Sequence, residues 1–217
     1  MVGRMINTVL FTETNSVFGD GFLSLLDDEK EIDLSAVVVR SDGIECDYYL
    51  DEAHPVNNRV TAQEKGIMTL APERTDSPDF IENLREIKPD YFIVANYQLR
   101  LTKIVLQIPR LDAINFHPSP LPKYAGLAPF YWMAKNHEVN GGVSAIHMDV
   151  GLDDGDIIAQ QLLKLHGDES AQQIRDSHFE ASWRLLSLVL PTLVDQSYRY
   201  VPQDLSQRTY YGSPDAQ

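Results

Sequence analysis

The stretch "DAINFHPSPLP", residues 112–122, changes character halfway along and decides the fold class. Its first half is an apolar run that predicts a buried strand, and its second half carries three prolines, which disfavour a helix. Residues two apart on a strand point to the same side, so Asn115 and His117 can face one cleft. The stretch therefore predicts a strand that ends in a stiff loop and presents an amide and an imidazole.

Apolar runs of this kind alternate with helical patterns along the chain. Strands are predicted at 6–12, 33–40, 67–70, 90–95 and 112–116, and helices at 16–29, 77–87, 128–138 and 168–196. We expect Pro191 to end or kink the last helix. Two later strands, 141–150 and 156–165, are joined by a short acidic turn and can form a hairpin. Alternating strands and helices predict an α/β fold with a mainly parallel sheet.

The domain organisation follows from the length of 217 residues, which suits a single domain with a small extension. We expect a catalytic domain over 1–201 and a polar C-terminal tail over 202–217, with 41–58 as an irregular loop. A short N-terminal apolar run reads as a first strand, and we expect neither a signal peptide nor a transmembrane helix. The single cysteine, Cys46, fits a reducing cytoplasm and excludes a cysteine-based zinc site.

The formal net charge of −14 bears on the kind of partner. Nucleic-acid-binding proteins usually carry basic patches, and the sequence shows no cluster of lysine and arginine. We therefore expect a small-molecule partner, with neither nucleic acid nor a membrane. A homo-oligomer is compatible with the sequence, which does not reveal the oligomeric state.

Three polar segments follow predicted strands, where ligands bind in open α/β sheets: 96–99, 115–122 and 151–156. An amide and an imidazole at Asn115 and His117 can together hold a carbonyl that becomes an oxyanion. The alternative is that Asn115 caps a turn and His117 is an ordinary loop histidine. On residue types alone, both readings stay open.

The acidic segment "MDVGLDDGDI", 148–157, also has competing readings. Its aspartates do not keep the spacing of a calcium-binding loop, so we expect no metal. It is either a plain acidic turn or the source of a carboxylate that faces His117 and acts on its proton. His147 and Asp149, two apart on one strand, form a competing acid–base pair, although a half-buried strand histidine is the simpler reading.

The combined motifs resemble the folate-dependent formyltransferases, a family that acts on glycinamide ribonucleotide, methionyl-tRNA and amino sugars. The resemblance rests on "INFHPSPLPKYAGLAP" (114–129) and "GGVSAIHMDVGLDDGDIIAQQ" (141–161), which hold the elements N-x-H-P-S-x-L-P, Gly, G-V-[TS] and L-D-x-G in order. "VANYQLRLTKIVLQIPRLDAIN" (94–115) is similar to the family's folate loop and approach strand. The resemblance implies a Rossmann-like formyltransferase fold, with helices on both faces of a twisted sheet and a C-terminal hairpin plus long helix.

The resemblance also implies a reaction and the residues that perform it. The formyl group of 10-formyltetrahydrofolate, the co-substrate, passes to a primary amine without a metal. Asn115, His117 and Asp153 are the implied catalytic residues. The implied folate-binding residues are Asn96, Tyr97, Gln98, Leu99, Arg100, Asp149, Val150 and Gly151, and the implied substrate-binding residues are Pro118, Ser119 and Gly126.

The sequence limits the identity of the amine acceptor only through its departures from the family's patterns. The phosphate loop of the glycinamide ribonucleotide enzymes is missing from "TETNSVFGDG" (12–21), and Ala125 stands where many sugar and tRNA enzymes have arginine. We also expect neither the second domain of the tRNA enzymes nor the regulatory domain of the formyl-folate hydrolases. A nucleotide-linked amino sugar leads by elimination. The alternatives are glycinamide ribonucleotide, hydrolysis of formyltetrahydrofolate, and a folate-binding module without catalysis.

Overall fold

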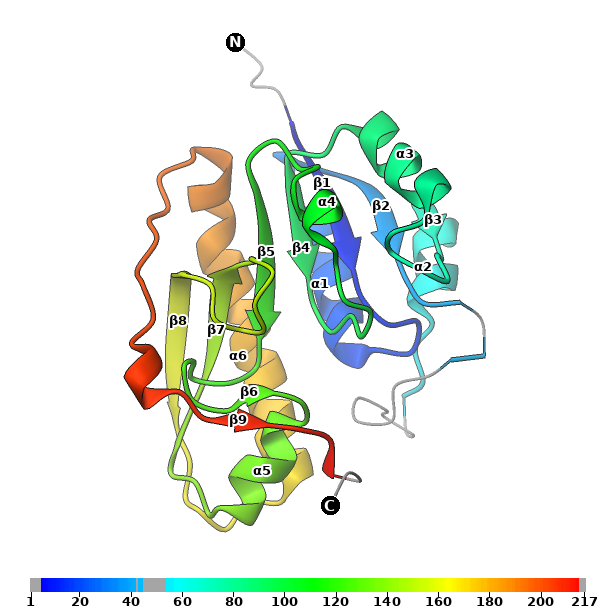
Figure 1. Ribbon diagram of the computed structural model, residues 1–217. Coiled ribbons are helices and arrows are strands. Elements are labelled where there is room, and N and C mark those ends of the chain that lie inside the picture. Colours follow the sequence, from blue (N-terminus) through cyan, green and yellow to red (C-terminus); the bar gives the residue numbers. More distant parts are fainter. Residues whose placement is uncertain (1–4, 42, 45–53, 215–217) are drawn as a thin grey trace. The chain divides into compact units, whose positions relative to one another are not determined.

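The computed structural model describes residues 5–41, 43–44 and 54–214 and divides into two compact units, Met1–Ile114 and Asn115–Gln217 (Figure 1). Cys46 and most of the loop predicted at 41–58 lie outside the described residues. The chain passes from the first unit to the second within one strand, β5 (Asp112–His117).

The first unit is a parallel sheet in the order β3-β2-β1-β4. Its strands are β1 (Ile6–Phe11), β2 (Ile32–Val38), β3 (Met68–Leu70) and β4 (Tyr91–Val94). Four neighbouring residues of β4 are all buried, as expected for a parallel strand covered on both faces. This confirms the predicted mainly parallel α/β architecture.

Helices connect these strands and place a switch point at their carboxyl ends. They are α1 (Val17–Asp28), α2 (Asn58–Glu64), α3 (Pro78–Ile87) and α4 (Lys103–Leu106). The order β3-β2-β1-β4 reverses direction at β1, so right-handed crossovers place α1 and α2 on one face and α3 on the other. The loops after β1 and β4 therefore meet where α/β sheets bind ligands.

Local sequence explains where α1 begins. Ser16 is the N-cap, and its hydroxyl accepts a hydrogen bond from the Gly19 N–H at 3.0 Å. Phe18, Phe22 and Leu26 recur every fourth residue and are fully buried against the sheet. The predicted helix 16–29 is thus confirmed to within one residue at each end.

The second unit contains the hairpin and the long helix that the sequence predicts. β7 (Asn140–His147) pairs antiparallel with β8 (Ile157–Lys164), and β5 neighbours β7. α6 (Ala171–Val194) packs on both strands of the hairpin, and a capping box between Ser170 and Gln173 fixes its start. α5 (Pro129–Lys135) packs on α6.

The structure corrects one sequence-based expectation and adds elements that the sequence did not predict. Pro191 does not end the last helix, because α6 continues to Val194 and the carbonyl of Pro191 accepts the capping N–H of Asp195 at 3.1 Å. Helices α2 and α4 were not predicted. The two-stranded sheet of β6 (Ala125–Gly126) and β9 (Tyr210–Tyr211) was not predicted either. Each of these strands has two residues, which is too few to show the alternation of a strand in the sequence.

None of the helices formed by the described residues combines the length and the hydrophobicity that crossing a bilayer requires.

Candidate active site

The end of β5 presents the amide and the imidazole as the alternation of the strand predicts. His117 is 7% exposed, and Asn115 is half-buried. Phe116, between them, is buried and 2% exposed. The intervening hydrophobic side chain anchors the strand, so the two polar side chains are held by the core rather than by a mobile loop.

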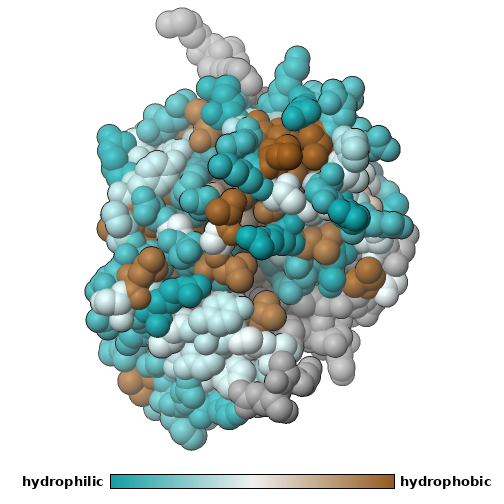
Figure 2. All heavy atoms as spheres, in the orientation of Figure 1, coloured by the Kyte–Doolittle hydropathy of each residue, from teal (hydrophilic) through white to brown (hydrophobic). Residues whose placement is uncertain are grey.

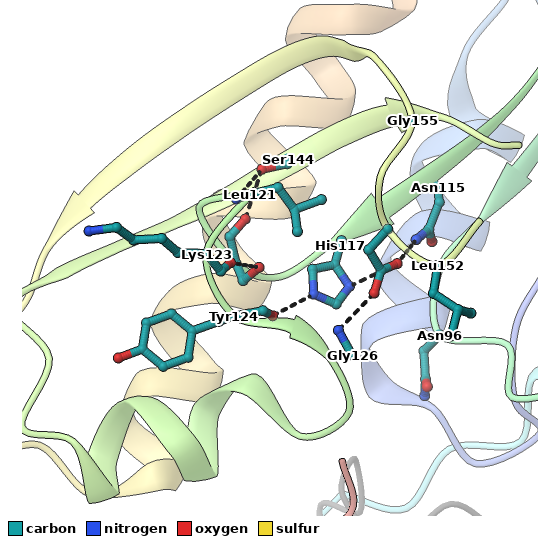
Figure 3. A network of polar contacts seen from close by, with 12 residues as sticks. Asn96, Asn115, His117, Leu121, Lys123, Tyr124, Gly126, Ser144, Leu152 and Gly155 are labelled. Atoms are coloured by element: carbon teal, nitrogen blue, oxygen red, sulfur yellow. Dashed lines mark hydrogen bonds and ion pairs between the residues drawn. The ribbon is translucent and has the colours of Figure 1, made fainter. Parts of the chain in front are cut away.

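One ring nitrogen of His117 forms a hydrogen bond within the protein. Nε2 lies 3.0 Å from the carbonyl oxygen of Tyr124. Figure 3 marks this contact with a dashed line between the two labelled residues. A carbonyl oxygen can only accept, so this nitrogen carries a proton in the hydrogen bond. Nδ1 is therefore the nitrogen that remains for chemistry.

Asp153 lies beside that nitrogen. Its Oδ1 is 3.7 Å from His117 Nδ1, which is an ion-pair distance rather than a hydrogen bond, and 3.4 Å from Asn115 Nδ2. Its Oδ2 accepts the backbone N–H of Gly126 at 2.8 Å (Figure 3). The carboxylate is thus fixed by a backbone donor and faces both predicted catalytic side chains.

The proline loop is held by an internal hydrogen-bond network. Ser119 is fully buried, and its hydroxyl donates to the Lys123 carbonyl at 2.9 Å. The Ser144 hydroxyl donates to the Ser119 carbonyl at 2.8 Å and accepts the Leu121 N–H at 3.1 Å (Figure 3). Of the expected substrate-binding residues, Pro118 and Ser119 are buried, and Gly126 bonds to the Asp153 carboxylate.

Tyr124 links the loop to the end of the chain. Its ring stacks on Tyr211 with centroids 5.3 Å apart, and its hydroxyl donates to Glu138 Oε2 at 2.8 Å. Burial, and then the neighbouring carboxylate, raise the pKa of the Tyr124 hydroxyl to about 12, so it stays a donor. Although burial acts in the opposite direction, hydrogen bonds from Tyr124 and the N–H groups of Asn140 and Val139 lower the pKa of Glu138.

The residues predicted to bind folate fall into two groups. Asp149, Val150 and Gly151 are exposed in the turn between β7 and β8. Asn96 to Arg100 follow β4 in the first unit, where Asn96 has a φ of 61° and donates to the Ser16 hydroxyl at 3.1 Å.

A buried ion pair supports the 96–100 loop. Glu13, with a fully buried side chain, lies 2.6 Å from Nε of Arg40 and accepts the backbone N–H of Gln98 at 2.8 Å. Burial, and then the charge of Glu13, raise the pKa of the Tyr97 hydroxyl. Sequence reasoning did not find Glu13 or Arg40, since a lone acid and a lone base far apart carry no pattern.

The competing readings of the acidic segment separate clearly. His147 packs its ring edge-on against Tyr200, with centroids 5.6 Å apart. Among the described residues no group of three or more histidine, cysteine or acidic side chains is arranged to hold a metal ion. The structure thus brings the carboxylate of Asp153 to the two residues at the end of β5.

Comparisons with known proteins agree with this geometry. The sequence model of the formyl transferase family matches residues 6–190. The chain therefore belongs to the formyl transferase family.

Curated relatives are larger than this chain. A methionyl-tRNA formyltransferase from Geobacter metallireducens is 37% identical over 118 residues, which cover 54% of this chain and 38% of that protein. One from Ruminiclostridium cellulolyticum is 35% identical over 149 residues, covering 69% and 48%. The chain thus matches less than half the length of these two relatives.

Solved structures share the fold at low sequence identity. An N-formyltransferase from Helicobacter canadensis, in complex with folinic acid and dTDP-3-aminofucose, has a TM-score of 0.71 at 16% identity and covers 99% of this chain and 73% of its own. A phosphoribosylglycinamide formyltransferase from Coxiella burnetii has a TM-score of 0.74 at 19% identity, covering 96% and 100%.

Proposed function

We propose that this protein is an N-formyltransferase that moves the formyl group of 10-formyltetrahydrofolate to the primary amine of a small molecule. The observation that carries the proposal is the convergence of Asn115 Nδ2 and His117 Nδ1 on Asp153 Oδ1, at 3.4 and 3.7 Å. An amide donor, an imidazole and a carboxylate in this arrangement suit a transfer that passes through an oxyanion.

In the proposed mechanism the neutral amine attacks the formyl carbon and forms a new C–N bond. The formyl oxygen becomes an oxyanion, to which Asn115 Nδ2 and His117 Nδ1 donate hydrogen bonds. Because His117 Nε2 also donates to the Tyr124 carbonyl, the ring acts as an imidazolium, and Asp153 balances its charge.

Collapse of the oxyanion breaks the bond between the formyl carbon and N10 of the folate. The amine gives up one proton and N10 gains one, so the products are the formamide and tetrahydrofolate. Asp153 removes the amine proton, directly or through water. Bringing both reactants into one site supplies much of the remaining acceleration.

The donor and acceptor contacts belong to the same proposal. The backbone of Asn96–Arg100 and of Asp149–Asp153 would hold the pterin end, with Pro118, Ser119 and Gly126 on the acceptor side. The acceptor class we propose first is a nucleotide-linked amino sugar. We place the reaction in the cytoplasm, which suits a chain with a single cysteine.

The first experiment mixes the purified full chain with 10-formyltetrahydrofolate and a panel of amines, and follows the release of tetrahydrofolate. The panel contains dTDP-linked amino sugars, glycinamide ribonucleotide and methionyl-tRNA, with an arm that contains no amine. Turnover only with an amino sugar supports the proposal. Release without amine indicates a hydrolase, and folate binding without turnover in any arm indicates a non-catalytic module.

The assignment of the carboxylate has its own test. We expect Asp153→Asn to lower turnover by roughly 100-fold while donor binding persists, the scale expected when an acid–base partner is lost. His147→Ala is the control and should keep most of the activity, because its ring packs edge-on against Tyr200. Full activity of Asp153→Asn would show that the catalytic carboxylate is another residue.

A further inference from the structure

The segment after α6 returns along the hairpin and reaches the loop that carries Asp153. Val201 and Ile157 exchange backbone hydrogen bonds of 2.8 and 2.9 Å, which fix the returning chain beside β8. Residues 203–211, here called the clamp segment, follow directly. The segment contains a short 3₁₀ turn, Leu205–Gln207, and ends in β9.

Side chains of the clamp segment hold the backbone around Asp153. Gln203 Nε2 donates to the carbonyl oxygens of Asp153 at 3.0 Å and of Gly155 at 2.7 Å. Arg208 Nη2 donates to the carbonyl of Leu152 at 2.7 Å. Three carbonyls within four residues are thus bonded to one segment of the chain.

This support matters because the loop has an uncommon backbone conformation at Asp153. Its φ is 53°, in the left-handed region that residues with a Cβ seldom adopt. Such a conformation persists only where the surroundings fix it. Gln203 and Arg208 supply that fixation from outside the loop.

The clamp segment also forms hydrogen bonds with Tyr124, whose carbonyl oxygen bonds to His117. The Tyr124 N–H donates to Thr209 Oγ1 at 2.8 Å, and the Ala125 N–H donates to the Thr209 carbonyl at 3.0 Å. The Leu127 N–H donates to the Tyr211 carbonyl at 2.9 Å, completing the pairing of β6 with β9. Tyr124, which bonds to His117, directly precedes β6, and Gly126, which bonds to the Asp153 carboxylate, lies on it, so the clamp segment fixes both residues.

We infer that the clamp segment positions Asp153 against His117 for catalysis, and that Gln203 is its main positioning residue. The inference rests on the proposed formyl transfer for its kinetic part only. Gln203 does not act on the reactants; both of its amide hydrogens are engaged by the loop carbonyls. Residues 202–217, expected from the sequence to be a tail apart from the domain, therefore contribute to the candidate site through their described part.

The test is Gln203→Glu, which keeps the size of the side chain but replaces the donor by an acceptor facing two carbonyl oxygens. Gln207→Glu is the matched control, because it makes the same change on an exposed residue of the same segment. In Gln203→Glu we expect kcat to fall about 10- to 100-fold, while the KM for the formyl donor, 10-formyltetrahydrofolate, stays nearly unchanged. Gln207→Glu should behave as wild type. Gln203→Met, which removes the donor without adding charge, should show the same kinetic pattern.

A double-mutant cycle separates positioning from a general loss of stability. If Gln203 acts through Asp153, Gln203→Glu should lower the residual activity of Asp153→Asn by less than about threefold. A full additional loss in that background would overturn the inference. So would wild-type kinetics for both Gln203→Glu and Gln203→Met.

Hydrogen exchange followed by mass spectrometry gives a readout that needs no turnover. In Gln203→Glu we expect faster exchange at 149–156 than in Gln207→Glu, with exchange in α6 unchanged. Equal exchange in the two variants would overturn the inference even for an active enzyme. A wild type that is inactive with every acceptor would instead defeat the proposed function, while the exchange result would still decide the positioning role.

Discussion

At Gly126 the backbone leaves no room for a side chain. Its φ is 99°, and a Cβ built there would lie 2.1 Å from the Tyr211 carbonyl oxygen. The N–H of the same residue donates to Asp153. A single residue thus combines a left-handed backbone, a close approach of two strands and a hydrogen bond to the carboxylate that we propose as catalytic, a combination that only glycine permits.

We expect Gly126→Ala to lower the free energy of unfolding more than Gly167→Ala does. Gly167 is the matched control, since it lies in the same unit with a φ of 87°, but its nearest neighbour would be 3.2 Å from a Cβ. Backbone strain and the milder contact together should cost about 1 kcal/mol in the control, and the clash should at least double that loss at Gly126. Urea denaturation of both variants provides the measurement, and equal losses would contradict the steric argument.

At the scale of the element, α6 is attached to the hairpin by a buried histidine. His178 Nε2 accepts the Gly142 N–H at 3.1 Å, while Nδ1 lies 2.7 Å from the Ile174 carbonyl and donates to it. A Cβ on Gly141 would lie 2.8 Å from the ring, so glycine there makes space for the histidine. Burial lowers the pKa of His178 to about 4, against the effect of the hydrogen bond to Ile174.

This depressed pKa predicts a pH-dependent stability. As the pH falls, His178 of the unfolded chain takes up a proton near the ordinary histidine pKa, whereas His178 of the folded chain stays neutral. The contribution of His178 to the free energy of unfolding is therefore complete above about pH 6.5 and declines toward pH 4. Between pH 7 and pH 5 the loss from this residue is about 2 kcal/mol. Urea denaturation at both pH values should show this extra loss in the wild type and not in His178→Gln. Parallel stability curves for the two proteins would contradict it.

At the scale of the whole molecule, the net charge bears on whether this chain can bind a nucleic acid. The formal net charge is −14, and Figure 2 shows a face on which hydrophilic residues predominate and hydrophobic ones occur in small groups. The curated relatives act on methionyl-tRNA according to their names, yet they extend beyond the region that this chain matches. An acidic surface repels a polyanion over roughly 10 Å at physiological salt.

We therefore expect no retardation of tRNA by the purified chain in a gel at about 0.1 M salt, where repulsion is only partly screened. A methionyl-tRNA formyltransferase of Geobacter metallireducens serves as the positive control. Tight binding of tRNA by this chain, together with formylation of methionyl-tRNA, would move the acceptor from a small amine to the aminoacylated nucleic acid.

Local patterns accounted for most of the elements. Alternating and continuous apolar runs identified all the strands of the main sheet, and Ser16, Ser77 and Ser170 stand at the helix starts. Short elements such as α4 and β6 were not predicted, because they contain too few residues to show a periodic pattern of apolar positions. Of the two outcomes expected at Pro191, the end of the helix does not occur there, because a proline near the end of a long, well-packed helix removes only one hydrogen bond.

The amino-acid sequence by itself determined the family and the strand that presents Asn115 and His117, the two residues proposed to act on the formyl group, because these depend on short-range periodicity and motif order. Only the tertiary structure showed that the Tyr124 carbonyl occupies His117 Nε2, that Gly126 holds Asp153, and that residues 203–211 support both. Those contacts join residues up to 85 positions apart, as between Tyr124 and Thr209. No local pattern encodes a partner at that distance, since the chain brings the two together only when the whole unit folds.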